Sequence, residues 1–166
     1  MKSKIMHYIK EILFFFILLT ISANLISLYK SSDLNDKALE IKTIKLLDGT
    51  FFKVDTTKPI LIHFWAVWCP TCKVEASNIE SITKDFQVLT IAVKSGTDKE
   101  IQTFLDKNSF TYKVVNDKDG NIAGKFNISA YPTTFIYDKN QNLLFSDVGY
   151  TSTWGLWFRM WFARVW

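Results

Sequence analysis

The sequence predicts a protein of the α/β class, because strand-like and helix-like segments alternate along most of its length. Residues 59–66, P-I-L-I-H-F-W-A, are a nearly continuous apolar run, typical of a strand buried on both faces of a parallel sheet. Val74, Ile79 and Ile82 roughly follow helical spacing, and residues 86–93 form a second apolar strand. With 166 residues, 48% hydrophobic and 22% charged, the chain can bury one ordinary core.

The first 29 residues predict a membrane anchor that precedes the fold. Residues 12–29 are apolar and, at about 1.5 Å per residue, just long enough to cross a hydrocarbon core of about 30 Å. The basic flank, residues 1–11, contains three lysines, so we expect a single-pass inner-membrane protein with its N-terminus in the cytoplasm and its domain in the periplasm. A cleaved signal peptide is the alternative, although Ser22 and Asn24 make a poor cleavage site.

The polar residues 30–37, K-S-S-D-L-N-D-K, predict a linker, which leaves residues 38–166 as one domain. Four lysines against one glutamate place +3 of the net charge of +4 in the first thirty residues. The domain therefore lacks the excess of positive charge that is typical of nucleic-acid-binding proteins.

Local patterns predict the other elements of this domain. Apolar residues alternate on either side of Asp48-Gly49, which predicts a β-hairpin over residues 41–54. Residues 97–107 begin with Thr-Asp and carry apolar residues at helical spacing, so they predict a capped amphipathic helix. The sequence next predicts a strand over 112–115 and, after the turn 116–120, a short helix that ends near Phe126. Strands 133–137 and 143–148 are predicted to form a closing antiparallel hairpin. An aromatic-rich helix is predicted from about Thr153.

The only two cysteines lie in the segment 64–72, F-W-A-V-W-C-P-T-C, directly after the first long strand. A structural zinc site needs four ligands, and the only histidines are His7 and His63. A disulfide across two residues closes a very small loop and restricts the unfolded chain little, which disfavours a structural staple. The pair is therefore predicted to be reactive.

A strand-to-helix junction places the first sulfur near unpaired amides and the positive end of the helix dipole, which stabilise a thiolate. We expect Cys69 to be the exposed nucleophile and Cys72, one turn later, to be less accessible and to resolve a mixed disulfide on Cys69. Pro70 begins the helix with a suitable φ angle.

This motif, followed by Tyr131-Pro132-Thr133, resembles that of thioredoxin-fold oxidoreductases. The anchor, the hairpin and the C-terminal V-G-Y-T-S-T-W-G-L-W-F-R-M-W more narrowly resemble the membrane-anchored suppressor-of-copper-sensitivity protein D (ScsD) group, which is allied to TlpA and the cytochrome-c maturation thioredoxins. The resemblance covers residues 38–166. It implies a thioredoxin fold with an N-terminal β-hairpin extension and a central insertion, and it implies no cofactor and no metal.

The resemblance also implies roles for residues around the cysteines. Pro132 would be a cis proline facing the disulfide, and the backbone of Tyr131 would pair with an extended substrate segment. Trp65 and Trp68 would pack around the rim of the site, with a plain core position as the alternative for Trp65. Pro70 and Thr71, between the cysteines, would tune the reactivity of the pair.

Two further residues have open alternatives. His63 stands six residues before Cys69, where thioredoxins resemble one another in carrying a buried aspartate. The imidazole of His63 would take up or release the proton of Cys72. Alternatively, His63 is a core histidine whose ring is hydrogen-bonded to the backbone. Glu75 matches an acidic residue of related motifs and would tune the reactivity of Cys69. Alternatively, it is an exposed carboxylate on the surface of the helix.

The predicted function is that of a periplasmic thiol:disulfide oxidoreductase, favouring reduction over oxidation, which acts on cysteine-containing proteins. Resemblance implies a DsbD-like transmembrane electron donor. Reduction of apocytochrome-c thiols is an alternative substrate assignment. Alternatives of other classes are a copper-binding assembly factor, disfavoured because no histidine follows His63, and a non-catalytic interaction module.

The aromatic-rich last helix has two interpretations. Its apolar residues pack on the sheet, or some of them contact the lipid interface, where tryptophan is enriched.

Overall fold

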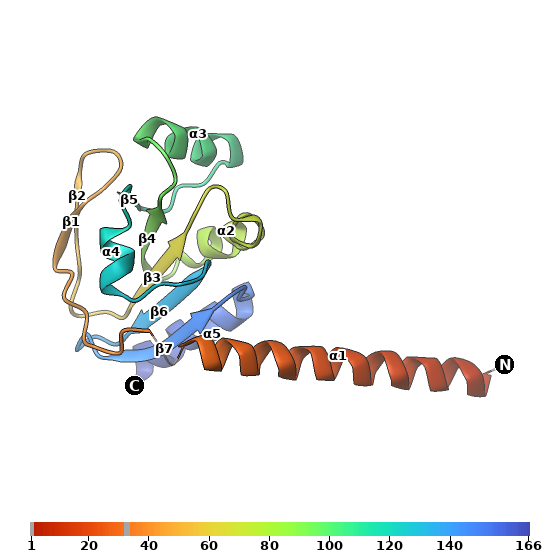
Figure 1. Cartoon of the computed structure of the whole chain (residues 1–166). Coiled ribbons are helices and arrows are strands. Elements are labelled where there is room, and N and C mark those ends of the chain that lie inside the picture. The colour runs from red at the N-terminus through yellow and green to blue at the C-terminus, as the bar shows by residue number, and fades with distance from the viewer. Residues whose placement is uncertain (1, 32–33) are drawn as a thin grey trace.

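The computed structural model describes residues 2–31 and 34–166 and has a five-stranded mixed sheet at its centre (Figure 1). Its order is β5-β4-β3-β6-β7. The strands are β3 (Ile60–Trp65), β4 (Gln87–Val93), β5 (Val114–Asp117), β6 (Thr133–Tyr137) and β7 (Leu143–Val148). The other elements are α1 (Lys2–Ser31), the hairpin of β1 (Thr43–Lys45) and β2 (Phe51–Lys53), α2 (Pro70–Ile82), α3 (Asp98–Asn108), α4 (Asn121–Lys125) and α5 (Thr153–Val165).

The central strand β3 is buried along its whole length, as its apolar run predicts. It is parallel to β4, with Trp65 opposite Ala92, and antiparallel to β6, with Phe64 opposite Thr133. Because β3 and β4 are parallel, their carboxyl ends lie at the same edge of the sheet. The segment that carries the cysteines leaves the sheet at this edge.

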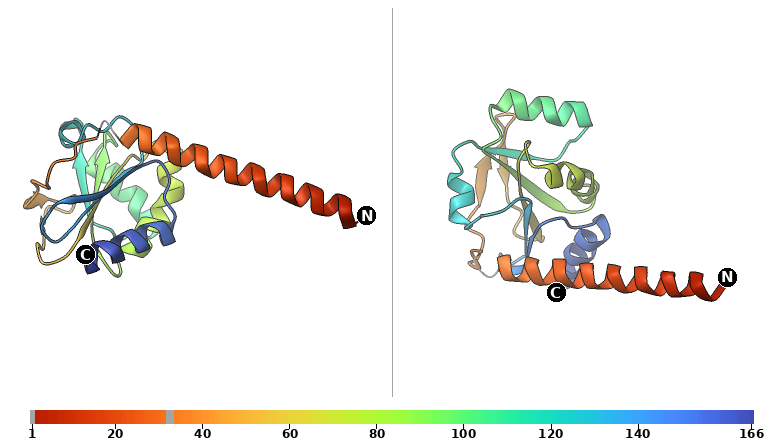
Figure 2. Two further views of the ribbon diagram at one scale, coloured as in Figure 1. Left: turned by 90° about the horizontal axis from the view of Figure 1, so that it is seen from below. Right: turned by 45° about the vertical axis from the view of Figure 1, so that its right-hand side comes forward.

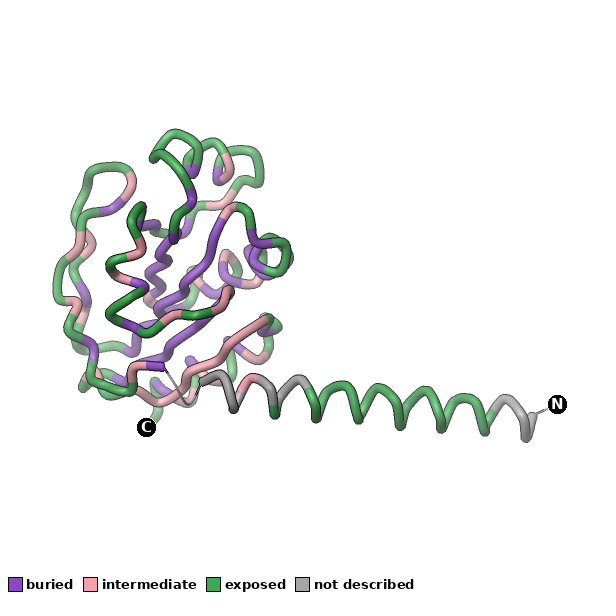
Figure 3. The backbone as a smooth tube through the Cα atoms, in the orientation of Figure 1, coloured by how far each residue is buried: buried purple, intermediate pink, exposed green. Residues whose placement is uncertain are grey.

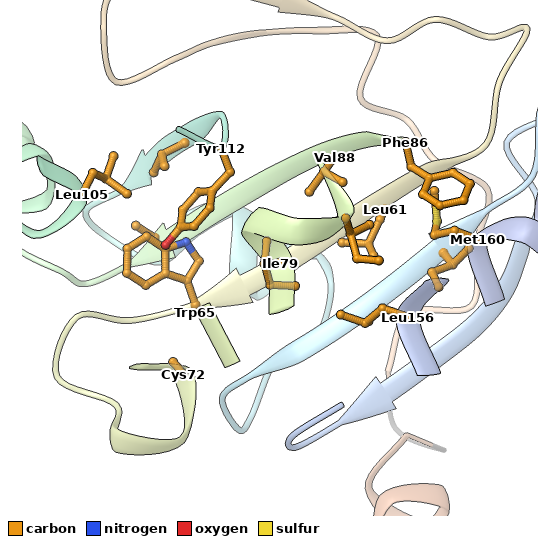
Figure 4. Packing of buried hydrophobic residues seen from close by; sticks show 14 of the residues in the cluster. Leu61, Trp65, Cys72, Ile79, Phe86, Val88, Leu105, Tyr112, Leu156 and Met160 are labelled. Atoms are coloured by element: carbon orange, nitrogen blue, oxygen red, sulfur yellow. The ribbon is translucent and has the colours of Figure 1, made fainter. Parts of the chain in front are cut away.

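Two apolar layers cover the two faces of the sheet, as the burial pattern along the chain shows (Figure 3). On one face, side chains of α2 and α5 pack on β3. Figure 4 shows Ile79 of α2 and Leu156 and Met160 of α5 with Leu61 and Trp65 of β3. On the other face, residues of α4 and of the β1–β2 hairpin pack against the alternate residues of β3.

The observed elements confirm the α/β class and the predicted order of strands and helices. Thr97 caps α3 with the reciprocal hydrogen bonds to Glu100 that a capping box makes. The strand predicted at 112–115 begins two residues later, at Val114, and Tyr112 instead packs in the core before it. We assign α3 and β5, which lie between β4 and α4 and add an edge strand, to the predicted central insertion.

The helix α1 projects from the domain beside β7 (Figures 1 and 2). Near its C-terminal end, the backbone N–H of Val148 donates to the Ser27 hydroxyl at 3.2 Å. Within the described part of the chain, no helix combines the length and hydropathy required to span a membrane. The anchor predicted over 12–29 is thus not confirmed.

Part of the predicted linker contacts the domain. Residues 32 and 33 lie outside the described residues, but Leu34 is buried and the Asn35 side chain donates to the Lys125 carbonyl at 2.9 Å. The backbone N–H of Leu39 donates to the Gln141 carbonyl at 3.0 Å.

Candidate active site

Cys69 is the N-cap residue of α2 and follows a short loop at the end of β3. Its backbone is extended, with φ −85° and ψ 114°, and Pro70 occupies the start of the helix as predicted. The backbone N–H of Cys72 donates to the Cys69 Sγ at 3.2 Å. A capping side chain in this position faces the unpaired amides and the positive end of the helix, which stabilise a thiolate.

Cys69 and Cys72 form a disulfide bond. Cys69 is only 5% exposed and Cys72 2% exposed, so the prediction that Cys69 is exposed is wrong for this oxidised state. The order of accessibility is nevertheless as predicted. Pro70 and Thr71, between the two cysteines, are both exposed and belong to the first turn of α2.

The segment that precedes β6 lies against the disulfide. The Tyr131–Pro132 peptide bond is cis, which confirms the predicted conformation, and the Tyr131 carbonyl oxygen lies 3.7 Å from the Cys69 Sγ. Trp68 is 56% exposed, and its ring meets that of Tyr131 edge to face at 5.6 Å. Trp68 and Tyr131 therefore form an aromatic rim beside Cys69, while Trp65 does not.

Trp65 belongs to the core. It is 2% exposed and packs against Phe104 and Tyr112 at 5.3 and 5.9 Å between ring centroids. This position follows from the alternation of side chains along β3, since Leu61 and Trp65 share the face that α2 covers. Of the two positions considered for Trp65, the core position is thus confirmed and the rim position is wrong.

The loop after β4 holds the segment before Cys69, a role that the sequence did not reveal. The Trp68 indole N–H donates to the Lys94 carbonyl at 3.1 Å, and the Val67 N–H donates to the Ser95 hydroxyl at 3.1 Å. Ser95 is buried and donates in turn to the Val93 carbonyl. The parallel pairing of β3 and β4 could have indicated this contact, because it brings the loop after β3 and the loop after β4 to the same edge of the sheet.

Glu75 is completely buried one helical turn after Cys72, so the interpretation as an exposed helix carboxylate is wrong. Cys72 and Glu75 are three residues apart and lie on the same face of α2. The Glu75 Oε1 accepts a hydrogen bond from the Thr151 backbone N–H at 3.0 Å, and Oε2 is buried with no partner within the described residues. Burial is the main cause that raises the pKa of Glu75 to about 8. The hydrogen bond from Thr151 lowers this pKa, and the charge of Asp147 raises it.

Asp147 and Arg159 are partners of this region that sequence reasoning missed. The Arg159 guanidinium donates to the Asp147 Oδ1 at 3.1 Å. Burial raises the pKa of Asp147 and the Arg159 charge opposes this rise. Asp147 lies on β7 and its partner Arg159 on α5, so only the folded chain brings the Asp147 charge near Glu75 on α2.

His63 is buried on β3, and its Nδ1 lies 2.9 Å from the Thr134 hydroxyl on the neighbouring strand β6. Burial lowers the pKa of His63 to about 3, so the imidazole is neutral near pH 7. His63 thus has the buried position that the core interpretation predicts, with a side-chain partner rather than the backbone, and its role toward Cys72 stays a prediction.

Comparison with known proteins places this site in a family. Residues 30–146 match the AhpC/TSA family. A thioredoxin-like protein of Haemophilus influenzae is 34% identical over 126 residues, which cover 74% of this chain and 75% of that protein. The thiol-disulfide oxidoreductase ResA of Oceanobacillus iheyensis is 30% identical over 87 residues, covering 50% of this chain but only 45% of ResA.

A solved structure supports the fold. The thiol:disulfide interchange protein of the thioredoxin family from Chlorobium tepidum superposes with a TM-score of 0.64 at 20% identity. The superposition covers 78% of this chain and 98% of that protein. With the family match over residues 30–146 and the relative at 34% identity, the chain belongs to the AhpC/TSA family, as a member with the thioredoxin-like fold.

Proposed function

We propose that this thioredoxin-like thiol:disulfide oxidoreductase reduces disulfides of exported proteins through the pair Cys69 and Cys72, at the periplasmic face of the inner membrane. The observation that carries the proposal is the position of the Cys69 sulfur, which caps α2 and lies beside the Tyr131 carbonyl. The reductive direction rests on the resemblance to the TlpA and ScsD group.

In the first step, the Cys69 thiolate attacks one sulfur of a substrate disulfide. The substrate S–S bond breaks, a mixed disulfide forms on Cys69, and the other substrate sulfur leaves as a thiolate and takes up a proton. The helix N-terminus, which includes the Cys72 N–H directed at Sγ, favours the attacking thiolate. An extended substrate segment pairs with the backbone at Tyr131, with Trp68 beside it.

In the second step, Cys72 loses its proton and attacks the Cys69 Sγ, which releases the second substrate thiolate and forms the Cys69–Cys72 disulfide. Two electrons have then passed to the substrate. Glu75 is a suitable proton acceptor for Cys72, because it is buried on the same helix face. Only the ionised form of Glu75 can accept this proton, and its fraction grows as the pH approaches the Glu75 pKa of about 8. Because this pKa is close to that of a thiol, the transfer to the ionised form costs little free energy.

A second protein must return the disulfide to the dithiol. A DsbD-like transmembrane donor fits this role, because it would deliver electrons to the periplasmic side. Apocytochrome-c thiols are a narrower substrate class that would use the same two steps.

The membrane setting is part of the proposal. The apolar residues 12–29 and the basic flank 1–11 support a single anchor with its N-terminus in the cytoplasm. In α1, the large apolar side chains from Ile12 to Leu19 are all exposed and have no protein surface over them.

The direction of electron flow can be measured on the full chain in detergent. The protein is equilibrated with graded glutathione buffers, and the fraction of Cys69–Cys72 disulfide is read by thiol alkylation. A reduction potential near about −270 mV supports a reductase, whereas a value near about −120 mV identifies a disulfide donor and contradicts the proposal.

Substrates and donor can be trapped with the variant Cys72→Ala, which cannot resolve a mixed disulfide on Cys69. We expect exported proteins, and a membrane donor, to accumulate as covalent adducts that dithiothreitol releases. The double variant Cys69→Ser with Cys72→Ala is the control. If the single variant traps no more protein than this control, a role on protein disulfides is contradicted.

A further inference from the structure

The helix α5 is apolar on two opposite faces. Its inner face, with Leu156, Met160 and Ala163, is at most 1% exposed and packs in the core. A second stripe runs along the opposite face. We call it the outer stripe, and it consists of Trp154, Trp157, Phe158, Trp161 and Val165. A helix in water normally has a polar face opposite its buried one. The apolar outer stripe therefore indicates that this face of α5 contacts another surface.

The outer stripe exposes much aromatic surface and contains no charged residue. Trp154 is 82% exposed, Phe158 61% and Trp161 41%. Two arginines flank the stripe, and α5 contains no acidic residue. Arg159 pairs with Asp147, while the Arg164 guanidinium donates to the Asp85 carbonyl and lies over the Phe86 ring at 4.8 Å.

The helices α1 and α5 lie on either side of the edge strand β7. Both helices contact β7: the Phe145 ring of β7 meets Phe162 of α5 at 5.8 Å, and Ser27 of α1 accepts from Val148. Figure 2 shows α1 and α5 at this edge of the domain. The exposed apolar residues of α1 therefore emerge from the part of the domain that also carries α5.

We propose that the outer stripe of α5 inserts into the headgroup region of the bilayer that holds α1. This inference rests on the membrane anchor of the proposed function. Tryptophan rings prefer the membrane–water interface, where their apolar body is buried and their N–H remains hydrated.

The charges of α5 favour a lipid partner over a second copy of the chain. Arg164 has no acidic partner within the described residues, and a cation at the edge of an apolar stripe suits anionic phospholipid headgroups. Two copies of α5 packed on each other would bring together their arginines with no acidic residue from either helix. A bilayer therefore meets both the apolar stripe and its basic flank.

A photo-crosslinking experiment tests this contact on the full chain in vesicles of phosphatidylcholine and phosphatidylglycerol. The photoreactive residue p-benzoylphenylalanine replaces Phe158 in one variant and Phe51 in the other. Phe51 is a matched control because it is 70% exposed and lies on β2, on the far side of the domain from the free end of α1 (Figure 1). We expect about tenfold more phospholipid adduct at position 158 than at position 51, detected by mass.

Vesicle flotation and disulfide exchange are measured on the same samples. If the chain floats but position 158 gives no more lipid adduct than position 51, the inference is overturned while the anchor stands. Crosslinked dimers through position 158 also overturn it and identify a second copy as the partner. If the chain does not float, the anchor fails and the inference with it. Loss of thiol exchange in vesicle-bound protein that still gives the lipid adduct would contradict only the proposed redox function.

Discussion

At the scale of single residues, Glu75 is the group whose environment differs most from what its residue type suggests. Glutamate is rarely fully buried, so residue type alone favoured an exposed position. The helical stripe through Cys72, Ala76 and Ile79 carried the opposite signal, because Glu75 lies on that stripe. Its hydrogen bond from Thr151 could not be predicted, because 76 residues separate the two partners.

We expect Glu75→Gln to remove a pH dependence of stability. The folded protein holds the Glu75 proton up to a pKa of about 8, whereas the unfolded chain releases it near the ordinary glutamate pKa of 4.5. The free energy of unfolding of the wild type therefore falls as the pH rises between these values, and the variant lacks this contribution. The stability of the variant relative to the wild type should rise by about 2–4 kcal/mol across this window.

Guanidinium unfolding of the oxidised proteins at pH 4.5, 6, 7 and 8.5 measures the difference. All other titrating groups are present in both proteins, so the comparison reports Glu75 together with its electrostatic interaction with Asp147. A difference that stays constant with pH would show that folding does not raise the pKa of Glu75.

The His63 pair gives a second residue-scale prediction. Thr134→Val keeps the shape of the side chain but leaves the buried Nδ1 of His63 without its hydroxyl partner. We expect a loss of about 1–3 kcal/mol of unfolding free energy, because a buried polar group is left unsatisfied. The rate at which dithiothreitol reduces the disulfide should not change. A change of more than about threefold would indicate that His63 acts on the sulfurs after all.

At the scale of elements, local sequence patterns were sufficient to predict the α/β class and the order of the elements, whereas the thioredoxin fold was implied by the resemblance of the cysteine motif. The continuous run of β3, the capping signal of α3 and the Asp48-Gly49 turn each act locally, so their structural outcome can be predicted without tertiary contacts. The start of β5 was misplaced because Tyr112 is apolar enough to continue the strand pattern. In the structure its ring instead packs against Trp65, and the ladder begins at Val114.

The two faces of α5 should differ in their contribution to stability. Met160→Ala removes a fully buried side chain, and we expect it to cost about 2–5 kcal/mol. Phe158→Ala removes an aromatic side chain of the outer stripe and should cost less than about 1 kcal/mol in detergent solution. Chemical unfolding of the two variants measures both values. Equal losses would mean that Phe158 packs in the core.

At the scale of the whole molecule, the candidate site combines parts that the sequence separates widely. The cysteines and their helix position could be predicted, because the strand, the motif and the helix are contiguous. The parallel strands could place the loop after β4 at this edge, but the hydrogen bond of Ser95 and the ion pair of Asp147 and Arg159 could not be predicted, because these contacts form only when β4, β7 and α5 take their places. Hydrogen bonds and charges at such distances in sequence leave no periodic signal.

The attachment of the segment between α1 and the hairpin can be tested by proteolysis. Leu39 is 3% exposed, and Leu39→Ala should weaken the packing of this segment by about 2–3 kcal/mol. Trypsin should then cleave after Lys37 and Lys42 more than about tenfold faster, because local opening controls cleavage. Glu40→Ala, at an exposed neighbouring position, is the control. Equal rates for the two variants would show that this segment is already open in the wild type.

The hydrogen bonds of Ser27, Asn35 and Leu39 to the domain also limit how far the domain can move relative to α1. A domain on a free tether can rotate and search the space around its attachment point. Here the contacts before and after residues 32–33 set the orientation of the domain relative to α1. In this arrangement the disulfide has one direction relative to α1, and the proposed redox partner would have to present its own cysteines from that side. Productive encounters are then selected by the geometry of approach as well as by the chemistry of the sulfur atoms.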